Sequence, residues 1–214
     1  MHFLPAERRK ILGTNLKVLL VSFCVVIIDQ LSKLFVKGFS IPVLKLNFSG
    51  IHTGQRIPIV DGLFSITFVE NPGIAFGINF GSNFKILISL FTLAASVGLL
   101  IYLLKNREKS FNFRLSLALI LGGAAGNLID RIFYGVFYGY APLLYGKVVD
   151  FLDFRMFNLF IFNRTFGNYV FNFADVSVTA GVILLLYVFN KQKAAVKNID
   201  TNVENILAEK EGSN

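Results

Sequence analysis

Apolar residues along this chain gather into four windows, each long enough to cross a lipid bilayer. A transmembrane helix needs about 20 mainly apolar residues. Windows of this length cover Val18–Val36, Phe84–Leu104, Leu115–Phe133 and Phe171–Phe189. The second window is almost entirely hydrocarbon, whereas the other three also carry polar residues. The pattern predicts an all-α membrane protein with four transmembrane helices.

Shorter patterns between these windows predict small elements outside the bilayer. Phe64–Phe68 alternates apolar and polar residues, which is typical of a half-exposed strand. We therefore expect a small extracytoplasmic β-sheet within residues 37–83. Residues 134–170 form an enlarged outer loop rich in Phe and Tyr, side chains that suit the headgroup layer. Pro142 predicts an irregular segment in this loop and not an added span.

Basic residues predict the orientation of the chain. Lys and Arg lie before the first window, between the second and third, and after the fourth, whereas few lie in the stretch before the second window. The positive-inside rule then places both termini in the cytoplasm and residues 37–83 and 134–170 outside. We expect residues 1–197 to form a membrane-embedded domain and residues 198–214 to form a polar cytoplasmic tail.

Composition supports the membrane interpretation and excludes several classes of protein. Hydrophobic residues make up 54% of the chain, charged residues 16%, and the mean hydropathy is +0.62, whereas a soluble domain carries roughly 25% charged residues. The net charge is +8, and the Lys and Arg residues lie beside the apolar windows. This placement favours a role in membrane orientation over nucleic-acid binding. A single cysteine, Cys24, excludes an internal disulfide, and the absence of an H-E-x-x-H pattern argues against a zinc protease. We expect no metal and no cofactor.

Ionisable residues at membrane depth are costly, so each of them is a candidate for function. Asp29 and Lys33 lie four residues apart in the first window, in the favourable order for a helical ion pair. Such a pair either neutralises itself near the outer interface, or forms a polar patch that meets substrate headgroups or braces a site. Asn172 and Asp175 share one helix face at the start of the fourth window, where they serve as an N-cap and a first-turn acid or as functional groups.

The third window combines small residues with three polar ones. Gly122 and Gly126 have the small-xxx-small spacing that lets another helix approach closely. The same side of this helix leads to Asn127, Asp130 and Arg131 near the outer interface. Close packing explains the glycines but not the three polar residues.

Topology places three acids near one interface, and this suggests a chemistry. Asp130 lies near the end of the third window, Asp175 lies near the start of the fourth, and Asp150 lies between apolar residues in the outer loop. Two carboxyls held close together share a proton. One can then activate a water as a base while the other polarises a peptide carbonyl as an acid. The residues alone allow either Asp130 or Asp150 to partner Asp175.

These motifs together resemble the type II (lipoprotein) signal peptidases of bacteria. The resemblance runs in order through Asp29–Lys33, Asn71–Gly77, Gly122–Arg131, Val148–Phe151 and Asn172–Asp175. It implies an aspartic endopeptidase of the cytoplasmic (inner) membrane that cuts a lipoprotein precursor before its diacylglyceryl-modified Cys, at the outer face. The implied partners are lipid-modified prolipoproteins and membrane lipids, with no nucleic acid, and the expected state is a monomer.

The resemblance also implies roles for individual residues. Asp150 and Asp175 fall on the positions of the catalytic pair. Positions that bind substrate or shape the site fall on Asp29, Lys33, Asn71, Gly73, Asn127, Asp130, Arg131 and Asn172. The stretch between Arg131 and Asp150 is longer than is typical of the family, so we expect a larger outer lid here.

Three other classes of membrane protein remain as alternatives. A transporter or channel with a proton relay would place its acids near mid-membrane and show inverted repeats. A presenilin-type protease would carry a Gly-x-Gly-Asp signature, which is missing. A non-catalytic scaffold would not need so many polar groups at one depth.

Overall fold

The computed structural model describes residues 6–73, 82–161 and 164–211. Its long helices are α1 (Ala6–Lys37), α2 (Ser82–Lys105), α3 (Phe111–Ile129) and α5 (Phe173–Glu211). Among the described residues, four helical segments are long and apolar enough to cross a membrane, namely Lys17–Lys37, Lys85–Lys105, Phe111–Phe137 and Phe173–Ile199. The four predicted spans are therefore confirmed.

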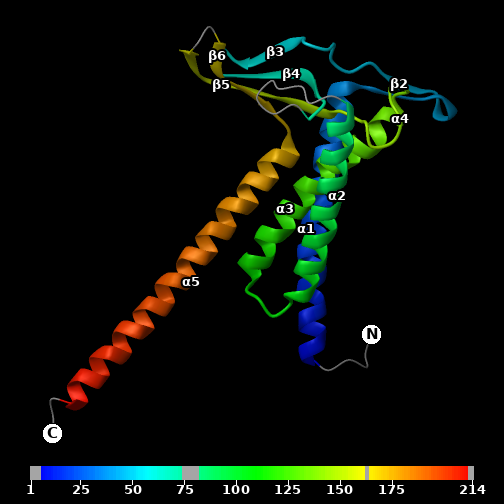
Figure 1. The fold of residues 1–214 in the computed structure, drawn as a ribbon. Coiled ribbons are helices and arrows are strands. Elements are labelled where there is room, and N and C mark those ends of the chain that lie inside the picture. Colours follow the sequence, from blue (N-terminus) through cyan, green and yellow to red (C-terminus); the bar gives the residue numbers. More distant parts are fainter. Residues whose placement is uncertain (1–5, 74–81, 162–163, 212–214) are drawn as a thin grey trace.

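The long helices do not all run along one axis. α1, α2 and α3 run side by side, and α5 leaves α3 at an angle (Figure 1). The fourth helix begins at Phe173, because Phe171, the predicted start of the fourth span, still belongs to a strand. α5 continues to Glu211, so the polar segment expected from residue 198 is an extension of this helix. The N-terminal end of α1 and the C-terminal end of α5 both lie on the side of the molecule opposite the sheet (Figure 1).

Glycines allow α3 to approach its neighbours closely. A Cβ atom added to Gly122 would lie 2.8 Å from the Cβ atom of Val25 on α1. A Cβ atom on Gly123 would overlap the carbonyl oxygen of Ala174 on α5. Side chains at these positions would push the helices apart, so the close packing predicted from the small residues of α3 is observed.

The strands lie at one end of the helices. β3 (Arg56–Val60), β4 (Phe64–Asn71), β5 (Val148–Ile161) and β6 (Arg164–Phe171) form an antiparallel sheet in that order (Figure 1). β4 confirms the strand predicted at Phe64–Phe68. Within the enlarged outer loop, residues 148–161 and 164–171 form β5 and β6, two strands that the sequence analysis did not anticipate.

The remainder of the second outer loop is irregular, as Pro142 predicted. A π-helical turn, η2 (Asp130–Tyr134), and a short α4 (Gly135–Phe137) lead from α3 into it. The hydroxyl of Tyr138 donates a hydrogen bond to the carbonyl of Gly38 at 2.7 Å, and the hydroxyl of Ser89 donates one to the carbonyl of Leu144 at 2.8 Å. These bonds hold the loop on the ends of α1 and α2.

The cytoplasmic location of the termini remains a prediction, which cysteine labelling can test. In a Cys24→Ala background, we expect Gln55→Cys to react with an impermeant thiol reagent in intact spheroplasts, because Gln55 is exposed on the sheet side. Asn198→Cys on α5 is exposed on the opposite side and should react only after lysis. The reverse labelling pattern would invert the orientation.

Candidate active site

Asn172 and Asp175 fix each other at the start of α5. The backbone N–H of Asp175 donates to Oδ1 of Asn172 at 3.0 Å, and the backbone N–H of Asn172 donates to Oδ2 of Asp175 at 3.2 Å. This is the reciprocal pattern of a capping box. The other carboxyl oxygen of Asp175 accepts a hydrogen bond from Nδ2 of Asn127 at 2.9 Å. Capping and site geometry therefore depend on the same bonds.

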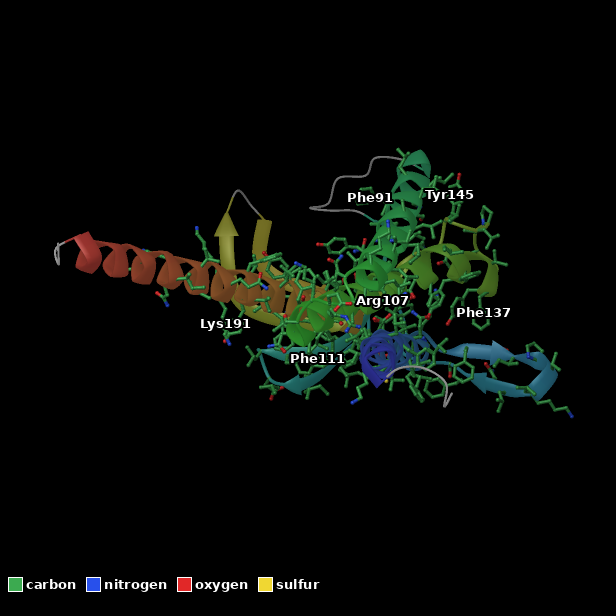
Figure 2. All side chains as sticks on the ribbon, turned by 90° about the horizontal axis from the view of Figure 1, so that it is seen from below. Phe91, Arg107, Phe111, Phe137, Tyr145 and Lys191 are labelled. Atoms are coloured by element: carbon green, nitrogen blue, oxygen red, sulfur yellow. The ribbon has the colours of Figure 1, made fainter. Side chains whose placement is uncertain are left out.

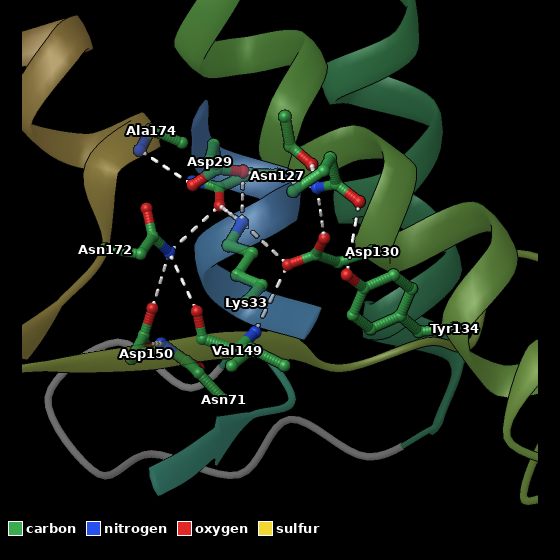
Figure 3. A network of polar contacts seen from close by, with 12 residues as sticks. Asp29, Lys33, Asn71, Asn127, Asp130, Tyr134, Val149, Asp150, Asn172 and Ala174 are labelled. Atoms are coloured by element: carbon green, nitrogen blue, oxygen red, sulfur yellow. Dashed lines mark hydrogen bonds and ion pairs between the residues drawn. The ribbon is translucent and has the colours of Figure 1, made fainter. Parts of the chain in front are cut away.

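Asp150 reaches the same point from the sheet. It lies on β5 between the buried side chains of Val149 and Phe151 and is itself buried. Nδ2 of Asn172 donates to Oδ1 of Asp150 at 2.7 Å (Figure 3), and Nδ2 of Asn71 donates to Oδ2 at 3.2 Å. Asn172 thus bonds to Asp150 through its Nδ2, and to Asp175 through its Oδ1 and its backbone N–H.

The orientation of the Asn71 amide is set by a local turn. The backbone N–H of Gly73 donates to Oδ1 of Asn71 at 2.9 Å, which leaves the NH₂ group to face Asp150. Gly73 has a φ of +90°, and a Cβ atom there would lie 3.2 Å from Nη1 of Arg131. Glycine therefore suits this position on two counts. The rest of the Asn71–Gly77 motif, from residue 74 on, lies outside the described residues.

The two carboxyls influence each other and a nearby cation. Burial raises the pKa of Asp150 to about 7, and the negative charge of Asp175 adds to the rise. Near neutral pH, the pair therefore readily keeps one proton. The guanidinium of Arg131 lies close enough to interact electrostatically with both carboxyls, and its positive charge offsets the remaining negative charge.

A buried lysine links the helices beneath the two carboxyls. Nζ of Lys33 lies 2.7 Å from Oδ2 of Asp29 and 2.8 Å from Oδ2 of Asp130, and it donates a hydrogen bond to Oδ1 of Asn127 at 2.9 Å (Figure 3). The side chains of Lys33, Asp29 and Asp130 are fully buried. An ammonium has three donors, and these three contacts use all of them. We call these four residues the Lys33 network.

The Lys33 network holds the backbone beside each acid of the pair. Oδ1 of Asp29 accepts from the N–H of Ala174 at 2.9 Å, one residue before Asp175. Oδ2 of Asp130 accepts from the N–H of Val149 at 3.2 Å, one residue before Asp150. Of the two interpretations of the Asp29–Lys33 pair, the structure supports the one in which the pair braces a site.

Two residues of this region were missed by the sequence analysis. Nε2 of Gln30 donates to Oδ1 of Asp130 at 2.8 Å, and the hydroxyl of Tyr134 donates to Oε1 of Gln30 at 3.1 Å. Gln30 is a polar residue within an apolar window, and this could have marked it as a candidate site residue. Tyr134 gave none, because tyrosine is common at the membrane interface. Tyr134 ends the π-helical turn η2, a type of turn that is frequent at functional sites.

An open, mainly apolar groove of about 650 Å³ lies beside Asp175. Its lining residues come from the end of β6 and the first turns of α5: Tyr169, Val170, Phe171, Asp175, Val176, Thr179, Ala180 and Ile183. An apolar segment in this groove would contact the side of α5 that carries Asp175. In the parts of the chain that the structure describes, no group of three or more His, Cys, Asp or Glu side chains is arranged to hold a metal ion.

Comparison with known proteins identifies the family. A profile described as signal peptidase (SPase) II matches residues 21–190. The chain belongs to the signal peptidase II family. The lipoprotein signal peptidase of Fusobacterium nucleatum is 33% identical over 190 residues, which cover 87% of this chain and 94% of that protein. That of Halothermothrix orenii is 35% identical over 177 residues, which cover 82% of this chain and 97% of that protein.

Solved structures agree with the family. A bacterial membrane enzyme superposes with a TM-score of 0.57 at 25% identity, covering 84% of this chain and 90% of that one. A second such structure gives the same TM-score at 26% identity. As a signal peptidase II, the chain is a multi-pass membrane peptidase, so the transporter and scaffold alternatives are set aside.

Within this signal peptidase II, the structure brings all ten residues predicted for the site to one end of the helices. Asp150 and Asp175 meet at Asn172, Asn71 and Asn127 bond to them, and Arg131 lies nearby. Asp130 pairs with Lys33 of α1 in the buried network. Arg131, its neighbour in sequence, also interacts with it electrostatically.

Proposed function

We propose that this signal peptidase II removes signal peptides from diacylglyceryl-modified prolipoproteins. It cuts before the lipidated Cys at the outer face of the bacterial cytoplasmic membrane, and Asp150 and Asp175 activate the attacking water. The observation that carries this proposal is the convergence of the two carboxyls on Asn172. The relatives' name, lipoprotein signal peptidase, supports the substrate class.

The environment of Asp150 supports its role as the acid. Burial raises the pKa of Asp150, so this carboxyl carries the shared proton and polarises the peptide carbonyl. Asp175 takes a proton from the water, whose oxygen attacks the carbonyl carbon. The carbon–nitrogen bond then breaks, and the proton on Asp175 passes to the leaving nitrogen. Arg131 offsets the negative charge of the pair throughout.

The groove beside Asp175 supports binding of an apolar substrate segment. Its lining is mainly apolar and runs along α5, so it opens toward the lipid. A signal peptide and the acyl chains of a lipidated Cys are both apolar. The substrate therefore does not need to leave the membrane to reach the carboxyls.

The substrate class can be tested with purified protein and two matched precursors. We expect a precursor with a diacylglyceryl-modified Cys to be cut immediately before that residue, and the same precursor with an unmodified Cys to remain uncut. Mass spectrometry of the products identifies the cleaved bond. Cleavage should persist with a chelator, since neither carboxyl needs a metal for this chemistry. Equal cleavage of both precursors, or a cut elsewhere, would contradict the proposal.

The pH dependence of the rate follows from the pKa of Asp150. Below a pH of about 7 the pair holds its proton, and above it both carboxyls ionise, so we expect the rate to fall as the pH rises through this value. At lower pH the pair gains a second proton and the rate falls again. The resulting bell-shaped profile belongs to the pair. Initial rates on a lipidated precursor measure it, and a rate that keeps rising into alkaline conditions would contradict the shared proton.

A further inference from the structure

A hairpin outside the main sheet has one apolar and one polar face. It consists of β1 (Phe39–Ile41), a 3₁₀ turn (Pro42–Leu44) and β2 (Leu46–Phe48). Its paired positions are Phe39 with Phe48, Ser40 with Asn47, and Ile41 with Leu46. Directly paired residues share a face, and successive residues alternate between faces. Two apolar pairs therefore lie on one face, and Ser40 and Asn47 lie on the other.

The tip and the apolar face of this hairpin are open to their surroundings. Val43 is 93% exposed and Leu44 is 62% exposed, and Leu46 and Phe48 are exposed as well. A contiguous exposed apolar patch marks a surface that something covers. An isolated two-stranded hairpin is also only marginally stable in water. A covering partner would resolve both problems.

The apolar face continues the membrane-facing surface of α1. Phe35 lies near the end of the span Lys17–Lys37 and is 61% exposed, and Leu31 one turn earlier is exposed too. The Phe35 ring contacts the Phe48 ring edge to face, with centroids 5.9 Å apart. The surface of α1 that lipid covers therefore runs without a break onto the hairpin.

The hairpin also has the direction that a membrane anchor needs. It projects sideways from the end of α1 (Figure 1). Seen from the opposite end of the molecule, it extends away from the helices into open space (Figure 2). Because its apolar face contacts Phe35, that face is turned back toward the bilayer. The polar face with Ser40 and Asn47 is turned away from the bilayer.

We propose that the β1–β2 hairpin is an interfacial anchor whose apolar face and Val43–Leu44 tip insert into the lipid layer at the sheet end of the helices. Ser40 and Asn47 face water. Lys45 follows the tip, is exposed, and places its ammonium at the level of the lipid phosphates. The lipid acts as the partner that covers the patch, and it holds the end of α1 at a constant depth beneath the sheet.

The absence of tryptophan from the chain allows a direct test. Val43→Trp introduces a single fluorophore at a position with few protein contacts. The protein is reconstituted into vesicles of phosphatidylcholine and phosphatidylglycerol, with acyl chains brominated near the headgroup or left unbrominated. We expect blue-shifted emission that is several-fold weaker in the brominated vesicles. Leu44→Trp should give the same result.

Two controls use the same protein and vesicles. Asn47→Trp on the polar face and Gln55→Trp in an exposed loop should show red-shifted emission with little quenching by bromine. Emission of Val43→Trp and Leu44→Trp equal to these controls would place the tip in water and overturn the proposal. Blue-shifted emission without bromine quenching would show that a second copy or another protein covers the hairpin, and this would also overturn it.

Discussion

Replacing either Asp150 or Asp175 by Asn removes nearly all cleavage of a lipidated precursor, while the protein still inserts and folds. Asn has almost the same shape as Asp, but its NH₂ group cannot accept a hydrogen bond. One of the two bonds that each carboxyl accepts is therefore lost, and some stability is lost with it. Asn can neither accept a proton from water nor donate one to the substrate. General acid–base catalysis is worth about 10²–10⁴-fold, and losing water activation as well moves the expected loss toward the upper end. Turnover of purified variants, normalised to folded protein, is the measurement.

Asp153→Asn is the matched control for this experiment. Asp153 is also a buried acid on β5, but it pairs with Nε of Arg56 at 3.1 Å. We expect this variant to keep its turnover and to lose some stability. Asp130→Asn tests the other assignment of the pair. Should Asp150→Asn retain turnover while a folded Asp130→Asn is inactive, the catalytic pair is Asp130 with Asp175.

Replacing Lys33 by Met is expected to destabilise the protein by about 3–5 kcal/mol, the usual effect of removing one partner from a buried ion pair. Met fills the volume of the lysine stem but leaves Asp29, Asp130 and Asn127 without the ammonium. The loss should appear as a lower free energy of unfolding in detergent. Lys109→Met is the control, because Lys109 is exposed in the loop between α2 and α3.

A double variant separates lost charge balance from lost packing. Lys33→Met combined with Asp29→Asn removes one positive and one negative charge together, so we expect it to be more stable than the sum of the two single changes predicts. Equal stability of Lys33→Met and Lys109→Met would show that the buried carboxyls do not need the ammonium. The network would then have no bracing role.

The sequence was informative wherever a local pattern determines the structure. Length and apolarity alone located the four spans, and the spacing of Gly122 and Gly126 predicted close packing of α3 against its neighbours. The ionic partner of Asp130 was not predictable in this way. It depends on which faces of α1 and α3 meet, and the sequence does not give this.

The strands of the second outer loop were missed because two preferences overlap. Phe and Tyr are frequent in strands and also at the membrane interface, so the composition of residues 148–171 fits both. The position of Asp150 opposite Val69 depends on pairing between β4 and β5, which are far apart in the chain. The residues alone therefore did not decide whether Asp130 or Asp150 partners Asp175, and only the family resemblance favoured Asp150.

The Lys33 network also has a consequence for how the protein is made. α1 is synthesised first and carries Asp29 and Lys33 into the membrane, but their further partners, Asp130 and the N–H of Ala174, arrive with α3 and α5. Charged residues in a membrane span are costly. Before α3 and α5 arrive, Asp29 and Lys33 pair with each other within α1. The polar side of the first span is therefore completed only when the later helices pack against it.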